Sequence, residues 1–184
     1  IYFRKSRDRE LPMLPAGNSM THFVALRRYF WGRQVLGDHV RALIQRVTKA
    51  SVMVDQKTVG FINSGLCVFV GITHGDDEAT AEKLAAKLWN LRIFEDEQRR
   101  MNLSVGEISG EILIVSQFTL YGDTSKGRRP SFVQAATPEI AEPLIEKVCE
   151  SLETLGARVA TGQFRAHMQV QIDNDGPITL SIDV

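Results

Sequence analysis

The chain has 184 residues, of which 43% are hydrophobic and 24% are charged. This composition supports one domain with a single core and argues against disorder of the whole chain, because enough apolar side chain is available to offset the ordering entropy. No window approaches the roughly 20 apolar residues that a bilayer-spanning helix needs, so we expect no membrane association.

The net charge of zero combines two regions of opposite sign. Residues 1–39 hold seven Lys/Arg and three Asp/Glu, and removing these from the totals of 22 and 22 leaves 15 basic and 19 acidic residues in 40–184. A mildly acidic body argues against a protein that coats nucleic-acid backbone, where phosphate neutralisation supplies the affinity. It still allows recognition of one end of an RNA through a local basic loop. The two cysteines, Cys67 and Cys149, lie outside any CxxC pair, which predicts reduced, buried thiols in a cytoplasmic protein.

Residues 1–39 differ from the rest of the chain. They begin at Ile1, contain Pro12, Pro15 and Gly17, and show no sustained hydrophobic period. Three interpretations compete: a translated upstream stretch or cloning remnant, an arginine-rich targeting peptide, and an ordered extension. Acidic residues and little serine weaken the targeting interpretation. We favour the first and predict that the folded domain comprises residues 40–184.

From Arg41 onward the pattern becomes regular. Strands are predicted at 41–48, 50–54, 58–62 and 66–73, the last being a nearly unbroken apolar run typical of a buried strand. Asp76 is a candidate N-cap for a helix that continues to about Arg92, because apolar residues recur there at three- and four-residue spacing.

A second buried strand is predicted at 111–120, ending in polar residues. Thr137 and Pro138 then supply the N-cap and first position of another helix, in which Pro143 can introduce a kink and which Gly156 ends. Short strands at about 157–161, 167–172 and 178–183 complete the chain. The order predicts a single α/β domain with a mixed sheet and two main helices packed on it, and not a doubly wound nucleotide-binding fold.

Standard catalytic motifs are absent from the sequence. It has no GxxxxGK[ST], no GxGxxG after a strand, no HExxH and no GxSxG. The histidines of residues 40–184, His74 and His167, are far apart and have no cysteine nearby. We therefore expect neither a metal site nor a cofactor.

Three polar stretches remain as candidates. Ser116-Gln-Phe-Thr119 ends the second buried strand, where α/β folds place ligands, although such residues can simply face water. Lys126, Arg128 and Arg129 surround Gly127 and suit phosphate binding, but a solvated loop is an equal alternative. Asn174-Asp-Gly-Pro-Ile-Thr179 carries the signal of a hairpin turn, yet a proline directly after that glycine is unusual for a plain turn.

Taken together and in this order, the three stretches resemble the motifs of the D-aminoacyl-tRNA deacylases. The opening strand Arg41–Thr48, Arg92-Ile-Phe-Glu95 and Met101-Asn-Leu103 are also similar to that family, so the resemblance covers 40–184 and none of 1–39. Val40 stands where the family begins with methionine. A GUG start codon is read as valine internally, which suggests that the natural protein starts at Val40.

The resemblance implies a barrel-like α/β fold and a homodimer that cleaves D-amino acids from tRNA, and also glycine from mischarged tRNA-Ala. It implies catalytic roles for Ser116, Gln117, Phe118 and Thr119. Backbone N–H groups near Phe118 and Thr119 would stabilise the oxyanion, the terminal ribose 2′-hydroxyl of the tRNA would assist, and the Thr119 side chain would orient and shape the pocket. It further implies that the Gly176–Pro177 bond is cis and reaches the partner subunit's pocket, where its carbonyl oxygens exclude L side chains.

The resemblance also implies pocket walls at Phe164 and Met168, and it makes Lys126, Arg128 and Arg129 candidate tRNA contacts. Arg165 departs from the pattern, since the family usually has a small residue there. Arg165 and His167 either tune contact with the tRNA end or face solvent. Two rival functions stay open: a catalytically silent RNA-binding module on the same fold, and a small-ester hydrolase with Thr119 as nucleophile.

Overall fold

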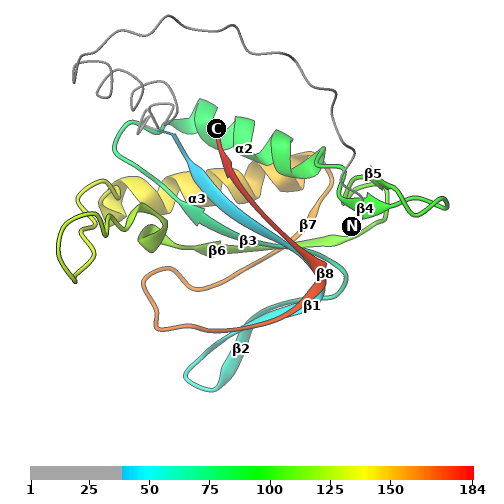
Figure 1. Cartoon of the computed structure of the whole chain (residues 1–184), viewed down its shortest axis with the longest axis horizontal. Helices are drawn as coiled ribbons and strands as arrows, with labels where there is room; N and C mark the ends of the chain where they lie inside the picture. Colours follow the sequence, from blue (N-terminus) through cyan, green and yellow to red (C-terminus); the bar gives the residue numbers. More distant parts are fainter. Residues whose placement is uncertain (1–38) are drawn as a thin grey trace, which may run out of the picture. The chain divides into compact units, whose positions relative to one another are not determined.

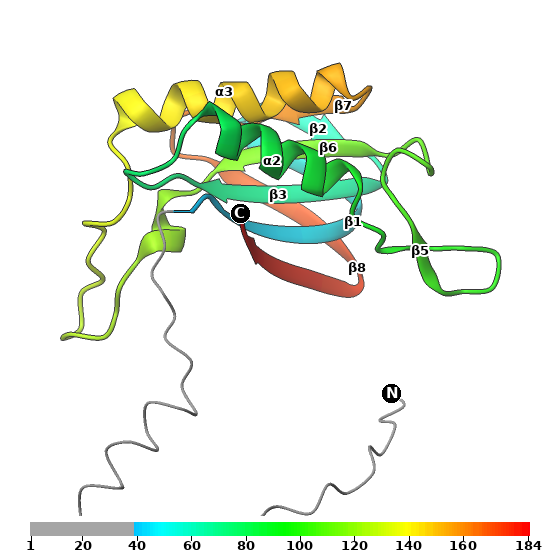
Figure 2. The same cartoon turned by 90° about the horizontal axis from the view of Figure 1, so that it is seen from above.

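The computed structural model describes residues 39–184, and the predictions for residues 1–38 lie outside this range. Within it, one curved sheet carries two helices on the same face, α2 (Glu78–Trp89) and α3 (Pro138–Thr154) (Figures 1 and 2). The predicted single α/β domain with two main helices is confirmed. No helix among these residues is long and apolar enough to cross a bilayer.

The long strand β1 (Arg41–Val54) organises the sheet. Its first half pairs antiparallel with β3 (Gly65–Gly71), and its second half pairs antiparallel with β2 (Lys57–Ile62). Strand β8 (Gln169–Asp183) also runs antiparallel along β1, over both halves. The sequence predicted two strands within β1 and two within β8, and both divisions were wrong.

Two parallel strands extend the sheet beyond β3. They are β6 (Glu111–Ser116) and β7 (Arg158–Thr161), which give the order β2-β1-β3-β6-β7. The two ends of this order come together, because a Cβ added to Gly60 of β2 would lie only 2.4 Å from the carbonyl oxygen of Thr161 in β7. The sheet is therefore nearly closed into a barrel, and glycine at position 60 allows the approach.

The helix boundaries follow local capping. The N-cap of α2 is Asp77, whose carboxylate accepts a hydrogen bond from the Thr80 N–H at 2.8 Å, and not the predicted Asp76. Asp76 instead accepts a hydrogen bond from the Thr73 N–H at 2.7 Å. The predicted start of α3 is confirmed, with Thr137 as N-cap and proline at the first position.

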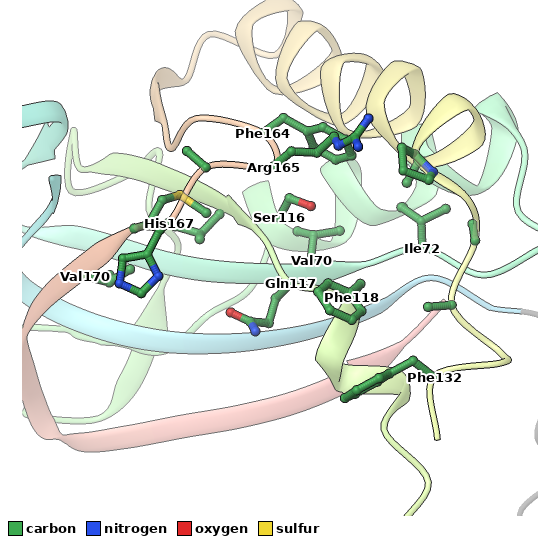
Figure 3. Close-up of a pocket in the computed structure, with 17 residues that line it drawn as sticks. Val70, Ile72, Ser116, Gln117, Phe118, Phe132, Phe164, Arg165, His167 and Val170 are labelled. Atoms are coloured by element: carbon green, nitrogen blue, oxygen red, sulfur yellow. The ribbon is translucent and has the colours of Figure 1, made fainter. Parts of the chain in front are cut away.

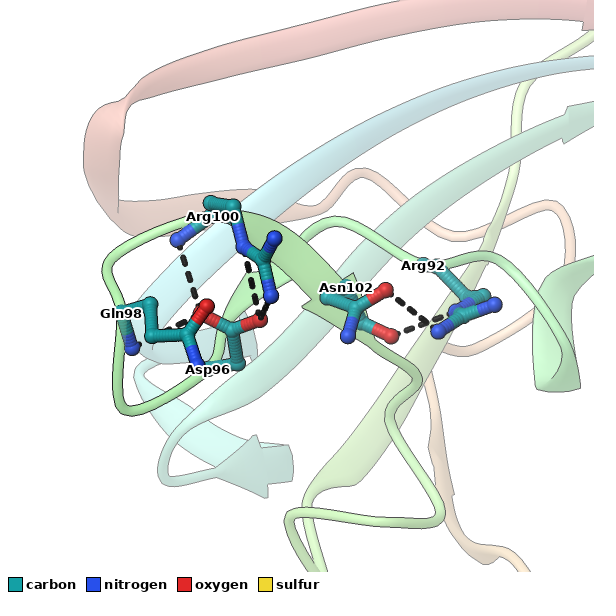
Figure 4. Close-up of polar contacts among 5 residues, drawn as sticks. All are labelled: Arg92, Asp96, Gln98, Arg100 and Asn102. Carbon is teal, nitrogen blue, oxygen red and sulfur yellow. Dashed lines mark hydrogen bonds and ion pairs between the residues drawn. The ribbon is translucent and has the colours of Figure 1, made fainter.

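Between α2 and β6 the chain forms a small hairpin of β4 (Phe94–Glu95) and β5 (Met101–Leu103). Asp96 holds its tip, because its carboxylate accepts backbone hydrogen bonds and pairs with the Arg100 side chain at 3.2 Å (Figure 4). The hydrogen bond from the backbone N–H of Arg100 contributes most to holding the pKa of Asp96 below its ordinary value. At the base of the hairpin the Arg92 side chain donates to β5.

The two cysteines are free thiols; Cys67 is buried and Cys149 is partly buried. Burial raises the pKa of both thiols to about 12. In the unfolded chain a thiol ionises near pH 9, whereas the folded chain keeps its thiols protonated up to about pH 12. The free energy of unfolding is therefore unaffected by these groups below pH 9 and falls as the pH rises from 9 toward 12.

We expect both thiols of the folded protein to react with a thiol-specific reagent at pH 8 at least about 100-fold more slowly than in urea, because the thiolate is the nucleophile. Labelling kinetics in buffer and in denaturant measure this. Equal rates in the two conditions would contradict the burial of the thiolates.

Candidate functional site

A cavity of about 630 Å³ opens at the carboxyl end of β6 (Figure 3). One wall is the end of β6 with the start of a short 3-10 helix, η1 (Phe118–Tyr121). The facing wall is the segment 164–168 between β7 and β8, and the loop before α3 closes another side. Most of the lining is apolar, with the Ser116 hydroxyl and Gln117 amide on the strand side. A few polar groups in an apolar concavity are typical of small-ligand sites.

The strand side of the cavity differs from the predicted strand 111–120. β6 ends at Ser116, the Gln117 N–H donates to the Val70 carbonyl at 2.7 Å, and the chain then turns into η1. Phe118 and Thr119 begin η1, so their N–H groups have no acceptor within the helix. The end of the strand therefore offers a hydroxyl, an amide and backbone donors in one place.

Thr119 is the member of the predicted catalytic set that does not line this cavity. Its side chain is exposed, and its hydroxyl accepts a hydrogen bond from the Gln117 amide. Among the described residues, no histidine, lysine or carboxylate forms a hydrogen bond with that hydroxyl. Nothing in this arrangement activates Thr119 as a nucleophile.

Helix η1 is held in place by Arg41 of β1, which the sequence did not single out. The Arg41 guanidinium donates to the Leu120 carbonyl at 2.9 Å and to the Asp183 carboxylate at 3.0 Å. It also lies 5.0 Å from the centre of the Tyr121 ring. These contacts fix η1, and with it the backbone of Phe118, to the first and last strands of the domain.

The facing wall carries the two predicted pocket residues, Phe164 and Met168, together with Arg165 and His167 (Figure 3). Arg165 has φ = +60°, in the left-handed region that favours glycine. Arg165 and His167 are the titratable side chains among the residues that line the cavity.

The mouth of the cavity on the η1 side is aromatic. Phe118, a residue that is 55% exposed, meets Phe132 edge to face with ring centres 5.0 Å apart. Phe132 ends the loop that carries Lys126, Arg128 and Arg129, all of them exposed and none of them lining the cavity. The structure thus places the basic loop next to the cavity and outside it.

Gly176 and Pro177 lie within β8, so the hairpin-turn alternative for this stretch is wrong. Asn174 pairs with Val47 and Thr179 with Gln45, which leaves residues 175–178 opposite Arg46 alone as a bulge in the ladder. The Gly176–Pro177 bond is cis, as expected. Both residues are exposed and neither lines the cavity of its own chain.

Arg46 supports this bulge from inside the domain, a role that the sequence did not reveal. Its side chain is 7% exposed, pairs with the Asp175 carboxylate at 2.8 Å and donates to the Ile93 carbonyl at 2.8 Å. The Asn174 amide adds hydrogen bonds to the carbonyls of Arg46 and Ile178. The bulge is therefore anchored on both sides of Gly176.

Backbone donors beside a hydroxyl and an amide suit an enzyme that stabilises charge on a carbonyl oxygen, which is the chemistry of acyl-bond hydrolysis. Among residues 39–184, no group of three or more His, Cys, Asp or Glu side chains is placed to hold a metal ion. The polar groups and backbone donors at the end of β6 suit a hydrolase of acyl bonds.

Comparison with known proteins identifies the family. The family model described as D-Tyr-tRNA(Tyr) deacylase matches residues 43–183. A D-aminoacyl-tRNA deacylase of Heliobacterium modesticaldum is 57% identical over 144 residues, which cover 78% of this chain and 96% of that protein. The D-aminoacyl-tRNA deacylase of Thermotoga petrophila is 54% identical, over 78% of this chain and 97% of its own length. The chain belongs to the D-aminoacyl-tRNA deacylase family, as its sequence predicted, and is an enzyme of the hydrolase class.

Solved structures agree on the fold. The c-Myc DNA unwinding element binding protein superposes with a TM-score of 0.74 at 40% identity, over 78% of this chain and 98% of that one. A probable eukaryotic D-amino acid tRNA deacylase gives a TM-score of 0.70 at 19% identity, over 79% of this chain and 100% of that one, which shows the fold alone.

Proposed function

We propose that the chain hydrolyses the ester bond between tRNA and a D-amino acid in the cytoplasm, and that it also releases glycine mischarged on tRNA-Ala. The observation that carries this proposal is the cavity at the end of β6. Its lining brings Ser116, Gln117 and Phe118 together with Phe164 and Met168, which are far away in the sequence. The family to which the chain belongs gives this cavity its proposed substrate.

The proposed chemistry uses positioning and charge stabilisation. The aminoacyl group enters the cavity with its carbonyl at the start of η1, where the Phe118 and Thr119 N–H groups receive the developing oxyanion. Water attacks the ester carbonyl with the assistance of the neighbouring ribose 2′-hydroxyl of the substrate. The bond between the carbonyl carbon and the ribose oxygen then breaks, which releases the free amino acid and the tRNA with its 3′-hydroxyl. An ester is reactive enough for this combination to suffice, and Thr119 orients Gln117 through their hydrogen bond.

Selection against L-amino acids is assigned to Gly176 and Pro177 of a second copy. A pocket that accepts many side chains cannot select by contacting them. Selection is possible if protein atoms fill the volume next to Cα into which the side chain of an L-amino acid would point. Glycine, which has no side chain, passes. The exposed bulge, anchored by Arg46, and its absence from the cavity of its own chain support insertion into a partner's cavity in a homodimer.

The remaining tRNA contacts are assigned to Lys126, Arg128 and Arg129. Their loop joins the cavity through Phe132, so cations on it lie where the RNA backbone leaves the pocket. Contacts of this kind add affinity without reading sequence.

The proposal is tested by ester loss from D-Tyr-tRNA and from D-tyrosine ethyl ester at equal concentrations of the full chain. We expect rapid deacylation of the tRNA and little hydrolysis of the free ester. Comparable efficiency on both would favour the small-ester hydrolase. No activity on either, with tRNA still bound, would favour a catalytically silent RNA-binding module.

A further inference from the structure

The wall of the cavity that faces η1 carries a cation, Arg165, for which the sequence left open contact with the tRNA end or simple exposure to solvent. Arg165 lines the cavity, and its side chain extends toward the start of α3 (Figure 3). Residue 165 is exposed, and no hydrogen bond or ion pair among the described residues engages its guanidinium. The five donors of this group are thus available to a ligand at the mouth.

The backbone of Arg165 makes this position informative. Its φ of +60° is a conformation that arginine adopts much less readily than glycine. The backbone geometry alone therefore does not explain why an arginine occupies position 165. Arg99, at the tip of the β4–β5 hairpin, has a similar φ of +57° and is also exposed, but it does not line the cavity. The chain therefore contains its own control for a left-handed arginine.

The surroundings of Arg165 are consistent with an anionic ligand. The other lining residues are apolar or uncharged, apart from His167. The pKa of Glu139 in α3 is lowered chiefly by hydrogen bonds from its own backbone N–H and from the Thr137 side chain, and the charge of Arg165 is the last of its causes. The two residues form no ion pair, so the guanidinium of Arg165 is accessible at the mouth of the cavity.

We propose that Arg165 binds the phosphodiester nearest the aminoacylated nucleoside of the tRNA, and so acts as a substrate-binding residue of this chain. The inference rests on the proposed function. If the aminoacyl group and terminal nucleoside fill the cavity, their first phosphate emerges at its mouth, where a planar guanidinium binds phosphate with two parallel hydrogen bonds. Lys126, Arg128 and Arg129, on the loop beyond Phe132, then contact phosphates further along the strand.

The test compares D-Tyr-tRNA with D-tyrosyl-adenosine, which has the ester and nucleoside but no phosphate. For each enzyme the readout is the ratio of kcat/KM for the tRNA to kcat/KM for the nucleoside. Arg165→Ala should lower this ratio about tenfold or more, mainly through KM for the tRNA, because a charge-assisted bidentate contact is lost. The salt dependence of KM for the tRNA should also become shallower by about 0.7 in log–log slope, the value for one phosphate contact on a single strand.

Three further variants separate charge from backbone. Arg165→Gly removes the charge and relaxes the left-handed backbone, and it should lower the ratio as Arg165→Ala does. Arg165→Lys keeps the charge and should recover part of the ratio. Arg99→Ala, the matched control, should leave the ratio within about twofold of the wild type, since it lies outside the cavity.

An unchanged ratio in Arg165→Ala, or an equal loss of activity on both substrates, would overturn the inference while leaving the proposed function intact. If the wild-type chain cleaves neither substrate, the proposed function fails and the role of Arg165 falls with it.

Discussion

A D-Tyr-tRNA that ends in 2′-deoxyadenosine should be deacylated at least about 100-fold more slowly than ordinary D-Tyr-tRNA, whereas the Thr119→Ala enzyme should keep at least about a third of wild-type activity. The substrate hydroxyl is expected to carry the proton transfer, a contribution of about 10²–10⁴-fold in enzymes. Among the described residues, the Gln117 amide is the only hydrogen-bond partner of the Thr119 hydroxyl, and Thr119 stands outside the cavity lining.

His167 is the control for this prediction, because it is the imidazole that lines the cavity. No hydrogen bond among the described residues joins it to Ser116 or Thr119, and we expect His167→Gln to remain active on ordinary tRNA. Single-turnover deacylation rates measure all of these effects. An active 2′-deoxy substrate together with an inert Thr119→Ala enzyme would identify Thr119 as the nucleophile.

Gly176→Ala should reduce the preference for D- over L-Tyr-tRNA at least about tenfold, equivalent to about 1.4 kcal/mol. The residue has φ = +113°, and the added methyl would lie 2.9 Å from Cγ1 of Ile178 and 3.2 Å from Nη2 of Arg46. The bulge must therefore shift, and with it the carbonyl oxygens that we assign to the exclusion of L side chains. Deacylation rates of both enantiomers measure the effect.

Gly156→Ala is the matched control, because Gly156 has φ = +99° after α3 and nothing within 4 Å of its added Cβ. Both substitutions should lower the free energy of unfolding by about 1–2 kcal/mol through backbone strain. Only Gly176→Ala should change stereochemical preference. A change of the same size in Gly156→Ala would show that general destabilisation, and not the position of the bulge, governs selectivity.

Local patterns were sufficient for the helices and for the existence of most strands. The error at the start of α2 is small, because Asp76 and Asp77 carry the same chemistry and only hydrogen-bond geometry distinguishes them. β8 shows where local reasoning fails. Asn174-Asp-Gly favours a turn, but pairing with β1 on both sides and the Asn174 hydrogen bonds keep the strand continuous.

The candidate site divides in the same way. Ser116, Gln117 and Phe118 were candidates because they lie at the end of a buried strand, but that position left exposure to water open, and the resemblance to a family supplied both their roles and the opposite wall. Arg41 and Arg46 could not be chosen, because in the sequence they look like the polar residues of any ordinary strand. Their partners Asp183, Leu120 and Ile93 lie 142, 79 and 47 positions away in the chain. Such support depends on tertiary contacts that no local pattern encodes.

The most direct test of the central claim is the ratio of deacylation rates of D-Tyr-tRNA and L-Tyr-tRNA with the full chain, measured under single-turnover conditions and corrected for spontaneous hydrolysis. Exclusion of the L side chain at Cα predicts a ratio of at least about 100, equivalent to about 2.7 kcal/mol. A ratio near one, or no loss of D-tyrosine above the spontaneous rate, would contradict the account.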